Sequence, residues 1–305
     1  PLVDFGRIDG NPMLRDGATG DWIGTFDGHK GAVWSARLSR KEAERAVTGS
    51  ADFTAKIWDT RNGQTVHTFV HHHIVRAADF NGDSTKILTG GLEKKLRIFD
   101  LYRPDAAAME LIGHEGTIKA VVWDEARHAV LSAGEDSTVR IWDLRTMRQS
   151  GSIQTCPDAI STMTLSSDGQ YVTWAAGKTA NFWKPDSSFE DVKTVQTKEK
   201  TSSVSLHPNH QKFVAGSDED LWVRIYDFKT GEVSGTLDLL CLVTDILTLK
   251  LEVYKGHHGP IHTVSYSPDG EIYATGSEDG TIRLWQTDPT KPYGLWQKNH
   301  PMENQ

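Results

Sequence analysis

The tetrapeptide Lys56-Ile57-Trp58-Asp59 sets the period of this chain, because a similar aromatic residue, often followed by Asp, returns at nearly fixed intervals. The residues that correspond to Trp58 are Phe99, Trp142, Trp183, Tyr226 and Trp285. Successive intervals are 41, 43, 41, 43 and 59 residues. Self-similarity at about 40–45 residues is typical of a fold that repeats one small sheet. The last interval breaks the period and indicates an insertion.

Length and composition favour one all-β domain. The chain has 305 residues, and the repeat runs nearly from end to end. Hydrophobic residues make up 37% and there are 27 glycines, which fits many short strands joined by tight turns. The formal charge of −8 argues against direct nucleic-acid binding. The two cysteines, Cys156 and Cys241, are too far apart in sequence to indicate a zinc site or a disulfide framework.

No stretch of 18 apolar residues predicts a membrane span. We therefore expect a cytoplasmic protein that can also enter the nucleus. The pattern predicts no catalytic residues, metal, cofactor or small-molecule substrate.

Each unit passes through the same series of signals: a Gly-His pair, an apolar strand, a second strand with a small residue near its end, an Asp turn, and a third strand that ends in the aromatic residue. This series resembles the WD repeat, which implies a WD40 β-propeller of the seven-bladed type with an incomplete first blade. The expected organisation is a partial blade at 1–27, regular blades at 28–235 and 252–287, an insertion at 236–251 and a C-terminal tail at 288–305.

The resemblance also implies a hydrogen-bonded tetrad of His, Ser or Thr, Asp and Trp inside each blade. Three tetrads are complete: His29/Thr48/Asp52/Trp58, His114/Ser132/Asp136/Trp142 and His257/Thr275/Asp279/Trp285. A His-Ser-Asp set also suggests a hydrolase. We reject that interpretation because the set recurs once per blade with a Trp attached, as scaffolding does and a single active site does not.

The first unit lacks residues for one strand. The segment Pro1–Asp4 is typical of an inner strand, and Asp9–Arg15 is already typical of the third strand. No residues remain for the second strand. Together with the missing initiator Met, this favours an N-terminus that is incomplete in the sequence.

The long interval holds about 16 surplus residues, Thr236–Leu251, after the turn Lys229–Gly231. Read as a helix, this apolar segment puts Leu240, Val243 and Leu247 on one face, which would suit a docked partner. The alternative, which we favour, is a translated intron or an error in the gene model.

Several segments match the serine-threonine kinase receptor-associated family more specifically than the WD pattern does. They are Asp9–Arg15, Thr19–Phe26, Gly28–Trp34, Ala51–Lys56, Gly276–Gln286 and Tyr293–Trp296. This resemblance implies a non-catalytic adaptor whose partners belong to the SMN complex of snRNP assembly, to Unr-like RNA-binding proteins, or to receptor-kinase signalling of the TGF-β type. The rival is the WD-repeat i subunit of the third eukaryotic initiation factor, which Gly256–Ile261 would suit equally.

WD propellers commonly bind partners at the mouth of the central channel, through the residue that follows the first buried aliphatic of each inner strand. Alignment of the units gives Trp34, Arg76, Lys119, Ser161, Ser202 and His262. Aromatic residues and Arg are enriched at interface hot spots, so we expect this rim to receive an acidic or mixed peptide. The alternative is that the set arises by chance.

The tract His71-His72-His73 looks like a metal site. Its position matches the Gly-His place of the third unit, and alternate residues of a strand point to opposite faces. We therefore expect one of the three to stand in for the tetrad His rather than all three to bind metal.

Overall fold

The computed structural model describes residues 2–5, 10–17, 19–40, 43–155, 158–233, 253–255 and 257–287. Within these residues every regular element is a β-strand. The expected insertion at 236–251, both cysteines and the expected tail at 288–305 lie outside the described residues.

The described strands form seven antiparallel sheets. Sheet 1 contains β1 (Leu2–Phe5), β2 (Met13–Asp16) and β3 (Trp22–Thr25); sheet 2 contains β4 (Val33–Leu38), β5 (Arg45–Ser50), β6 (Thr54–Asp59) and β7 (Thr65–Val70). Sheet 3 contains β8 (Val75–Phe80), β9 (Lys86–Gly91), β10 (Lys95–Asp100) and β11 (Met109–Ile112). Sheet 4 contains β12 (Ile118–Asp124), β13 (Ala129–Gly134), β14 (Thr138–Asp143) and β15 (Arg148–Gln154).

Sheet 5 contains β16 (Ile160–Leu165), β17 (Val172–Ala176), β18 (Thr179–Trp183) and β19 (Val192–Gln196). Sheet 6 contains β20 (Thr201–Leu206), β21 (Lys212–Ser217), β22 (Trp222–Asp227) and β23 (Val253–Lys255); sheet 7 contains β24 (Ile261–Tyr266), β25 (Ile272–Ser277) and β26 (Ile282–Gln286).

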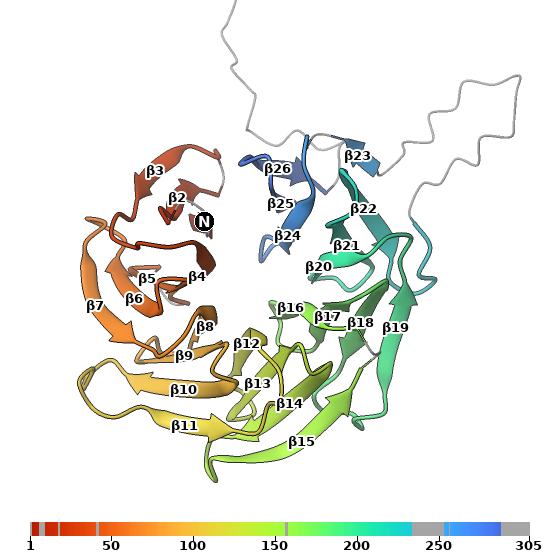
Figure 1. Ribbon diagram of the computed structural model, residues 1–305. Helices are drawn as coiled ribbons and strands as arrows, with labels where there is room; N and C mark the ends of the chain where they lie inside the picture. Colours follow the sequence, from red (N-terminus) through yellow and green to blue (C-terminus); the bar gives the residue numbers. More distant parts are fainter. Residues whose placement is uncertain are drawn as a thin grey trace, which may run out of the picture.

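The seven sheets are arranged around a common centre (Figure 1). In sheets 2 to 7 the first strand of the sheet is the innermost one. The inner strands β4, β8, β12, β16, β20 and β24 contact one another in this order around the ring. This arrangement is a β-propeller and confirms the predicted fold class.

The core lies between neighbouring sheets rather than within one central mass. Strand β14 shows the reason: Val139, Ile141 and Trp142 are buried, while the other three residues of the strand are partly exposed. Trp142 packs in one cluster with Leu88 of sheet 3 and Val130 of sheet 4. Each sheet therefore buries its apolar side chains against the next one, as repeat architectures do.

One polar contact ties three inner strands together. Asp79, near the end of β8, accepts hydrogen bonds from Arg40 Nη2 at 3.2 Å and from the backbone N–H of Trp123 at 2.9 Å. Arg40 also donates to the carbonyl oxygen of Trp123 at 3.0 Å. Sheets 2, 3 and 4 are thus linked at the end of the strands opposite to the rim.

A β-bulge interrupts the start of the inner strand in each of sheets 2 to 7. In sheet 2, Val33 pairs with Ser50 and Ser35 pairs with Gly49, so Trp34 is the extra residue. The same shift occurs in the other five sheets. A bulge inserts one unpaired residue and re-aims its side chain.

Sheets 1 and 7 each have three strands. In sheet 1, β1 pairs directly with β2, which pairs with the outer strand β3. The two sheets are neighbours in the ring (Figure 1). A Cβ built on Gly20 would lie 3.5 Å from Leu284 Cδ1, so the two ends of the described ring touch there.

The outer strand of sheet 6 is made of two pieces that are distant in sequence. Val233 forms a bridge with Tyr226, and Val253 pairs with Arg224 two residues earlier on β22. In sheet 2 the corresponding residues of the third strand, Trp58 and Lys56, pair with Thr65 and Thr68. Val233 and Val253 therefore take positions that are close neighbours in the outer strand of a regular blade, although they are far apart in sequence.

Candidate functional site

The tetrad of sheet 2 is centred on one hydroxyl oxygen. Thr48 Oγ1 lies 2.6 Å from His29 Nε2 and accepts the indole N–H of Trp58 at 2.8 Å. His29 Nδ1 lies 2.7 Å from Asp52 Oδ2, which also accepts the backbone N–H of Lys30 at 3.0 Å. The loop before β4 is thereby held to the turn between β5 and β6.

The other two complete sets repeat this geometry. In sheet 4, Ser132 Oγ lies 2.6 Å from His114 Nε2 and 2.8 Å from Trp142 Nε1, and Asp136 lies 2.7 Å from the imidazole. In sheet 7, Thr275 Oγ1 lies 2.7 Å from both His257 Nε2 and Trp285 Nε1. There Asp279 is 3.3 Å from the imidazole. The structure brings together all four residues of each predicted set.

Burial leaves these hydroxyl groups unsuited to nucleophilic attack, although their bonds to His and Asp follow the pattern of a catalytic triad. The hydroxyl accepts from the indole N–H and donates to Nε2 of a neutral imidazole, whose Nδ1–H donates to the carboxylate. Thr48, Ser132 and Thr275 are at most 1% exposed, so a substrate has no path to them. Burial lowers the pKa of His29 despite its contact with Asp52, which keeps the ring neutral near pH 7.

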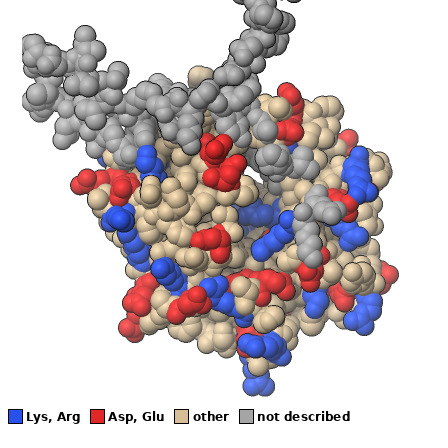
Figure 2. All heavy atoms as spheres, turned by 180° about the vertical axis from the view of Figure 1, so that it is seen from behind, with Lys and Arg blue, Asp and Glu red and all other residues tan. Residues whose placement is uncertain are grey.

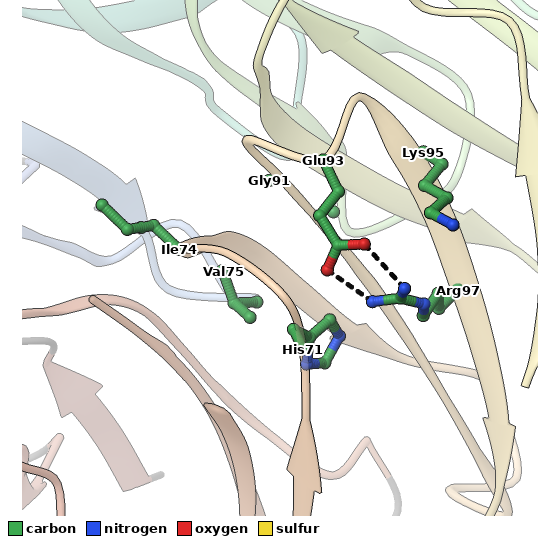
Figure 3. Close-up of a pocket in the computed structure, with 8 residues that line it drawn as sticks. His71, Ile74, Val75, Gly91, Glu93, Lys95 and Arg97 are labelled. Atoms are coloured by element: carbon green, nitrogen blue, oxygen red, sulfur yellow. Dashed lines mark hydrogen bonds and ion pairs between the residues drawn. The ribbon is translucent and has the colours of Figure 1, made fainter. Parts of the chain in front are cut away.

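Sheet 3 keeps only part of the tetrad. His71 Nε2 lies 2.9 Å from Thr89 Oγ1, but Phe99 has no N–H to donate to the same oxygen. Glu93 turns away from the imidazole and forms two hydrogen bonds of 2.6 Å with the Arg97 guanidinium (Figure 3). His71 Nδ1 instead faces the carbonyl oxygen of Phe69 at 3.2 Å.

A small pocket opens beside this incomplete tetrad. Its lining residues are His71, Ile74, Val75, Gly90, Gly91, Glu93, Lys95 and Arg97 (Figure 3). Its charged groups are occupied, because Lys95 and Arg97 both bind Glu110 at 2.9 and 3.0 Å. Only the first residue of the His71-His72-His73 tract is buried. Among the described residues there is no cluster of three or more His, Cys, Asp or Glu side chains arranged as metal ligands.

Sheets 5 and 6 replace the tetrad by packing. Trp174 occupies the Ser/Thr place of β17 and is 1% exposed, and Trp183 Nε1 donates to the carbonyl oxygen of Ser188 at 3.0 Å. In sheet 6, Ala215 takes the Ser/Thr place, and Tyr226 stacks on Phe213 with ring centroids 4.9 Å apart. Apolar contacts thus do here what hydrogen bonds do in sheets 2, 4 and 7.

The six predicted rim residues are the six bulge residues of the inner strands. They are Trp34, Arg76, Lys119, Ser161, Ser202 and His262. They occupy the same end of the ring because every inner strand runs in the same direction from its bulge. Ser202 differs from the rest: it is 6% exposed and its hydroxyl donates to backbone carbonyl groups of Gly216 and Ile261. The other five members keep some exposure.

Two of the basic rim residues have acidic neighbours. Lys119 Nζ lies 3.3 Å from Glu135 Oε1, and His262 Nε2 lies 3.8 Å from Glu278 Oε2. Each acid precedes the tetrad Asp of its own sheet. The rim is therefore of mixed charge rather than uniformly basic. The face that Figure 2 shows likewise carries basic and acidic side chains side by side around the central hollow.

Alignment of the units missed an aromatic pair next to this rim. Phe53 and His73 approach with ring centroids 5.3 Å apart, from the turn after β5 and the loop before β8. Phe53 is 43% exposed and has a φ of 68°, which a residue other than Gly rarely adopts. Its place directly after the tetrad Asp52 was the only sequence signal.

The repeated sheets with a buried Trp-centred tetrad define a WD-repeat β-propeller. The model of the WD domain, G-beta repeat, matches residues 20–59, 63–100, 107–143 and 249–286. These segments contain the three complete tetrads and the partial one of sheet 3. Sheets 5 and 6, which pack without the tetrad, supply almost none of the matched residues.

Similarity to particular proteins is spread over the whole chain. It is 46% identical to the serine-threonine kinase receptor-associated protein of Gallus gallus over 295 residues, which cover 97% of this chain and 78% of that protein. The protein of the same name from Dictyostelium discoideum is 44% identical over 281 residues, covering 92% of this chain and 88% of that protein.

Subunit I of eukaryotic translation initiation factor 3 from Culex quinquefasciatus is a more distant relative. It is 28% identical over 291 residues, with 90% of this chain and 87% of the subunit covered. The chain therefore belongs to the serine-threonine kinase receptor-associated protein family, as its sequence motifs predicted. It is a WD-repeat scaffold, and the initiation-factor subunit is only a distant homologue.

The described part of the chain contains no helix with the length and hydropathy needed to cross a bilayer.

Proposed function

We propose that this protein is a non-catalytic adaptor that collects other proteins for RNA processing, with components of the SMN complex or Unr-like RNA-binding proteins as its partners. The similarity of 44–46% over more than nine-tenths of the chain carries this proposal. The name of the relatives also supports association with a serine-threonine kinase receptor, as in TGF-β type signalling. The adaptor acts in the cytoplasm, with access to the nucleus.

The rim is the proposed place of capture. Its bulge residues are unpaired in the sheet and differ in chemical type from unit to unit. Trp34, Arg76 and Lys119 come from three successive inner strands, so they form one continuous patch. Aromatic and Arg side chains are the residue types that most often dominate binding energies at protein interfaces.

Affinity purification with mass spectrometry tests the adaptor role. The tagged full chain is expected to recover SMN-complex subunits or an Unr-like protein from cells of its own organism. Recovery of initiation-factor subunits in their place would favour the i-subunit alternative. Recovery of receptor kinases alone would favour the signalling role.

A charge-reversed variant tests the place of capture. Arg76→Glu with Lys119→Glu is expected to reduce recovery of the same proteins at least tenfold. The matched control is Arg103→Glu with Arg145→Glu, because both arginines are exposed in turns after the third strands, at the far end of the blades. Equal recovery by both double variants would exclude the rim.

A further inference from the structure

The side chains of Trp34 and Arg76 form a stack across the boundary between sheets 2 and 3. The Arg76 Cζ atom lies 3.9 Å from the centroid of the Trp34 ring. Trp34 remains 45% exposed, so the indole supports the guanidinium and still presents surface of its own. A cation held on an aromatic face is fixed in direction before any ligand arrives.

The guanidinium keeps its donors for a ligand. Arg76 makes no hydrogen bond or ion pair with any residue that the structure describes; Lys119 and His262 of the same rim, by contrast, each face a glutamate. The charge of Glu135 acts on it electrostatically, but Glu135 is in contact with Lys119. Burial lowers the pKa of Arg76. The guanidinium has therefore already lost part of its hydration in the free protein.

The bulges explain why the two residues meet. Trp34 and Arg76 are the extra residues at the starts of neighbouring inner strands, and β4 contacts β8 along its length. Phe53 and His73 bridge the same two sheets at the same end. An apolar aromatic surface therefore adjoins one unpaired, oriented guanidinium at a single sheet boundary.

We infer that the Trp34–Arg76 stack is the anchor of the rim and binds an extended peptide in which an Asp or Glu lies beside an apolar or aromatic residue. The inference rests on the proposed adaptor function and names the chemistry of its ligand. The carboxylate takes the two parallel N–H groups of Arg76, and the neighbouring side chain covers the indole.

Charge selects the carboxylate over a more highly charged anion. Among the six rim residues, all of which the structure describes, Arg76 is the cation without an acidic partner. Glu135 and Glu278 lie on the same rim and repel a polyanion such as RNA or a phosphorylated segment. The same two glutamates favour a basic residue elsewhere in the peptide. The expected ligand is thus of mixed charge, with its acid at sheets 2 and 3.

Selection of displayed random 16-residue peptides on the immobilised full chain provides the probe. Enriched peptides are expected to share an Asp or Glu next to an apolar or aromatic residue. Synthetic copies are then measured by fluorescence polarisation. We expect Arg76→Lys, which keeps the charge and loses the paired donors, to weaken binding about tenfold. Arg76→Gln should weaken it further, and Trp34→Phe should retain more binding than Trp34→Ala.

Changing the selected acid to its amide is expected to give the same loss as Arg76→Gln, and the two changes together should cost no more than either alone. Arg145→Gln is the control variant, and thermal unfolding checks that every variant is folded. Enriched peptides without an acid, equal binding by Arg76→Gln and wild type, or tighter binding of a phosphoserine peptide or an RNA oligonucleotide would each overturn the inference. None of these outcomes decides the adaptor role, which the recovery of cellular partners tests separately.

Discussion

In each complete tetrad one hydroxyl group forms hydrogen bonds with two buried nitrogen atoms, one of an imidazole and one of an indole. In sheet 2, Thr48 is the shared partner of His29 and Trp58, whereas in sheet 3 Thr89 serves His71 alone. A buried polar group left without a partner costs about 1–3 kcal/mol. The number of groups that depend on the hydroxyl therefore sets the stability of each blade's hydrogen-bond set.

The comparison of Thr48→Val with Thr89→Val measures this dependence. Removal of the Thr48 hydroxyl leaves an imidazole nitrogen and an indole N–H unpaired and should lower the free energy of unfolding by about 2–4 kcal/mol. Thr89→Val leaves one nitrogen unpaired and should cost about 1–2 kcal/mol. Urea titration followed by circular dichroism gives both values. Equal losses would contradict the shared role of Thr48.

The imidazole of His71 makes stability depend on pH. Burial, aided by the charge of Arg97, lowers its pKa to about 4 in the folded protein, against its usual 6.5. The unfolded chain therefore takes up a proton first as the pH falls. The stabilisation is fully present above about pH 6.5 and decreases as the pH falls towards 4, by on the order of 3 kcal/mol.

Urea titrations between pH 7 and pH 4 check this slope, with His71→Gln as the comparison. The variant should lose part of the pH dependence and keep the rest, since burial also lowers the pKa of His29, His114 and His257. Asp52 has a pKa of about 2, so its effect appears below this window. Identical profiles for variant and wild type would contradict the assignment to His71.

At the scale of the element, the outer strand of sheet 6 shows how little a blade depends on chain continuity. Val233 and Val253 pair with residues two apart on β22, although residues 234–252 separate them in sequence. An outer strand has a partner on one side only, so an interruption there leaves the inner three strands of the sheet intact. Inner strands, which contact both neighbouring sheets, have no such tolerance.

Deletion of residues 236–251 is therefore expected to preserve the fold. Closing the strand over a few residues instead of 19 should raise the free energy of unfolding by about 1.5 kcal/mol, because the loop-closure entropy falls. A variant with 16 Gly and Ser residues in the same place should match the wild type. Thermal and urea unfolding measure both. A deletion that destabilises the protein would mean that the segment makes contacts of its own.

Elements were more predictable from the sequence than the contacts between them. The period of Trp58 and its counterparts, with the Gly-His and Asp signals, gave the strands and the tetrad members, because each tetrad lies within one unit. The stack of Trp34 on Arg76 and the buried state of Ser202 depend on distances between units. No pattern within a unit contains those distances. The interval of 59 residues predicted an insertion, but only strand pairing showed that Val233 and Val253 belong to the same outer strand.

At the scale of the whole molecule, sheets 1 and 7 are the ends of a ring of repeats. Sheets 2 to 6 pack against a neighbour on each side, and strands β13 and β17 are buried along their full length. Every residue of β26 is half-exposed, and the outer strand β3 exposes Trp22 and Ile23. Stability in repeat proteins is a sum of contacts between neighbours, so it should decrease towards this seam.

Native-state hydrogen exchange tests this gradient. Amide groups of β3 and β26 should exchange fastest among the described strands, and those of β13 and β17 slowest, by several orders of magnitude. The order should hold when the pH and temperature are changed, because it follows from packing. Uniform protection around the ring would indicate that the molecule opens as a single unit.

The repeated bulge has a consequence for how such proteins diversify. In sheets 2 to 7 the inner strand has one residue outside the hydrogen-bond ladder, and in every case but the buried Ser202 that residue is exempt from the demands that fix its neighbours. Duplicated copies of the same scaffold can therefore exchange these side chains one at a time and acquire new recognition while the frame stays unchanged. Designers have the same freedom at the five exposed bulge residues, whereas Ser202 is held by its burial and its two hydrogen bonds.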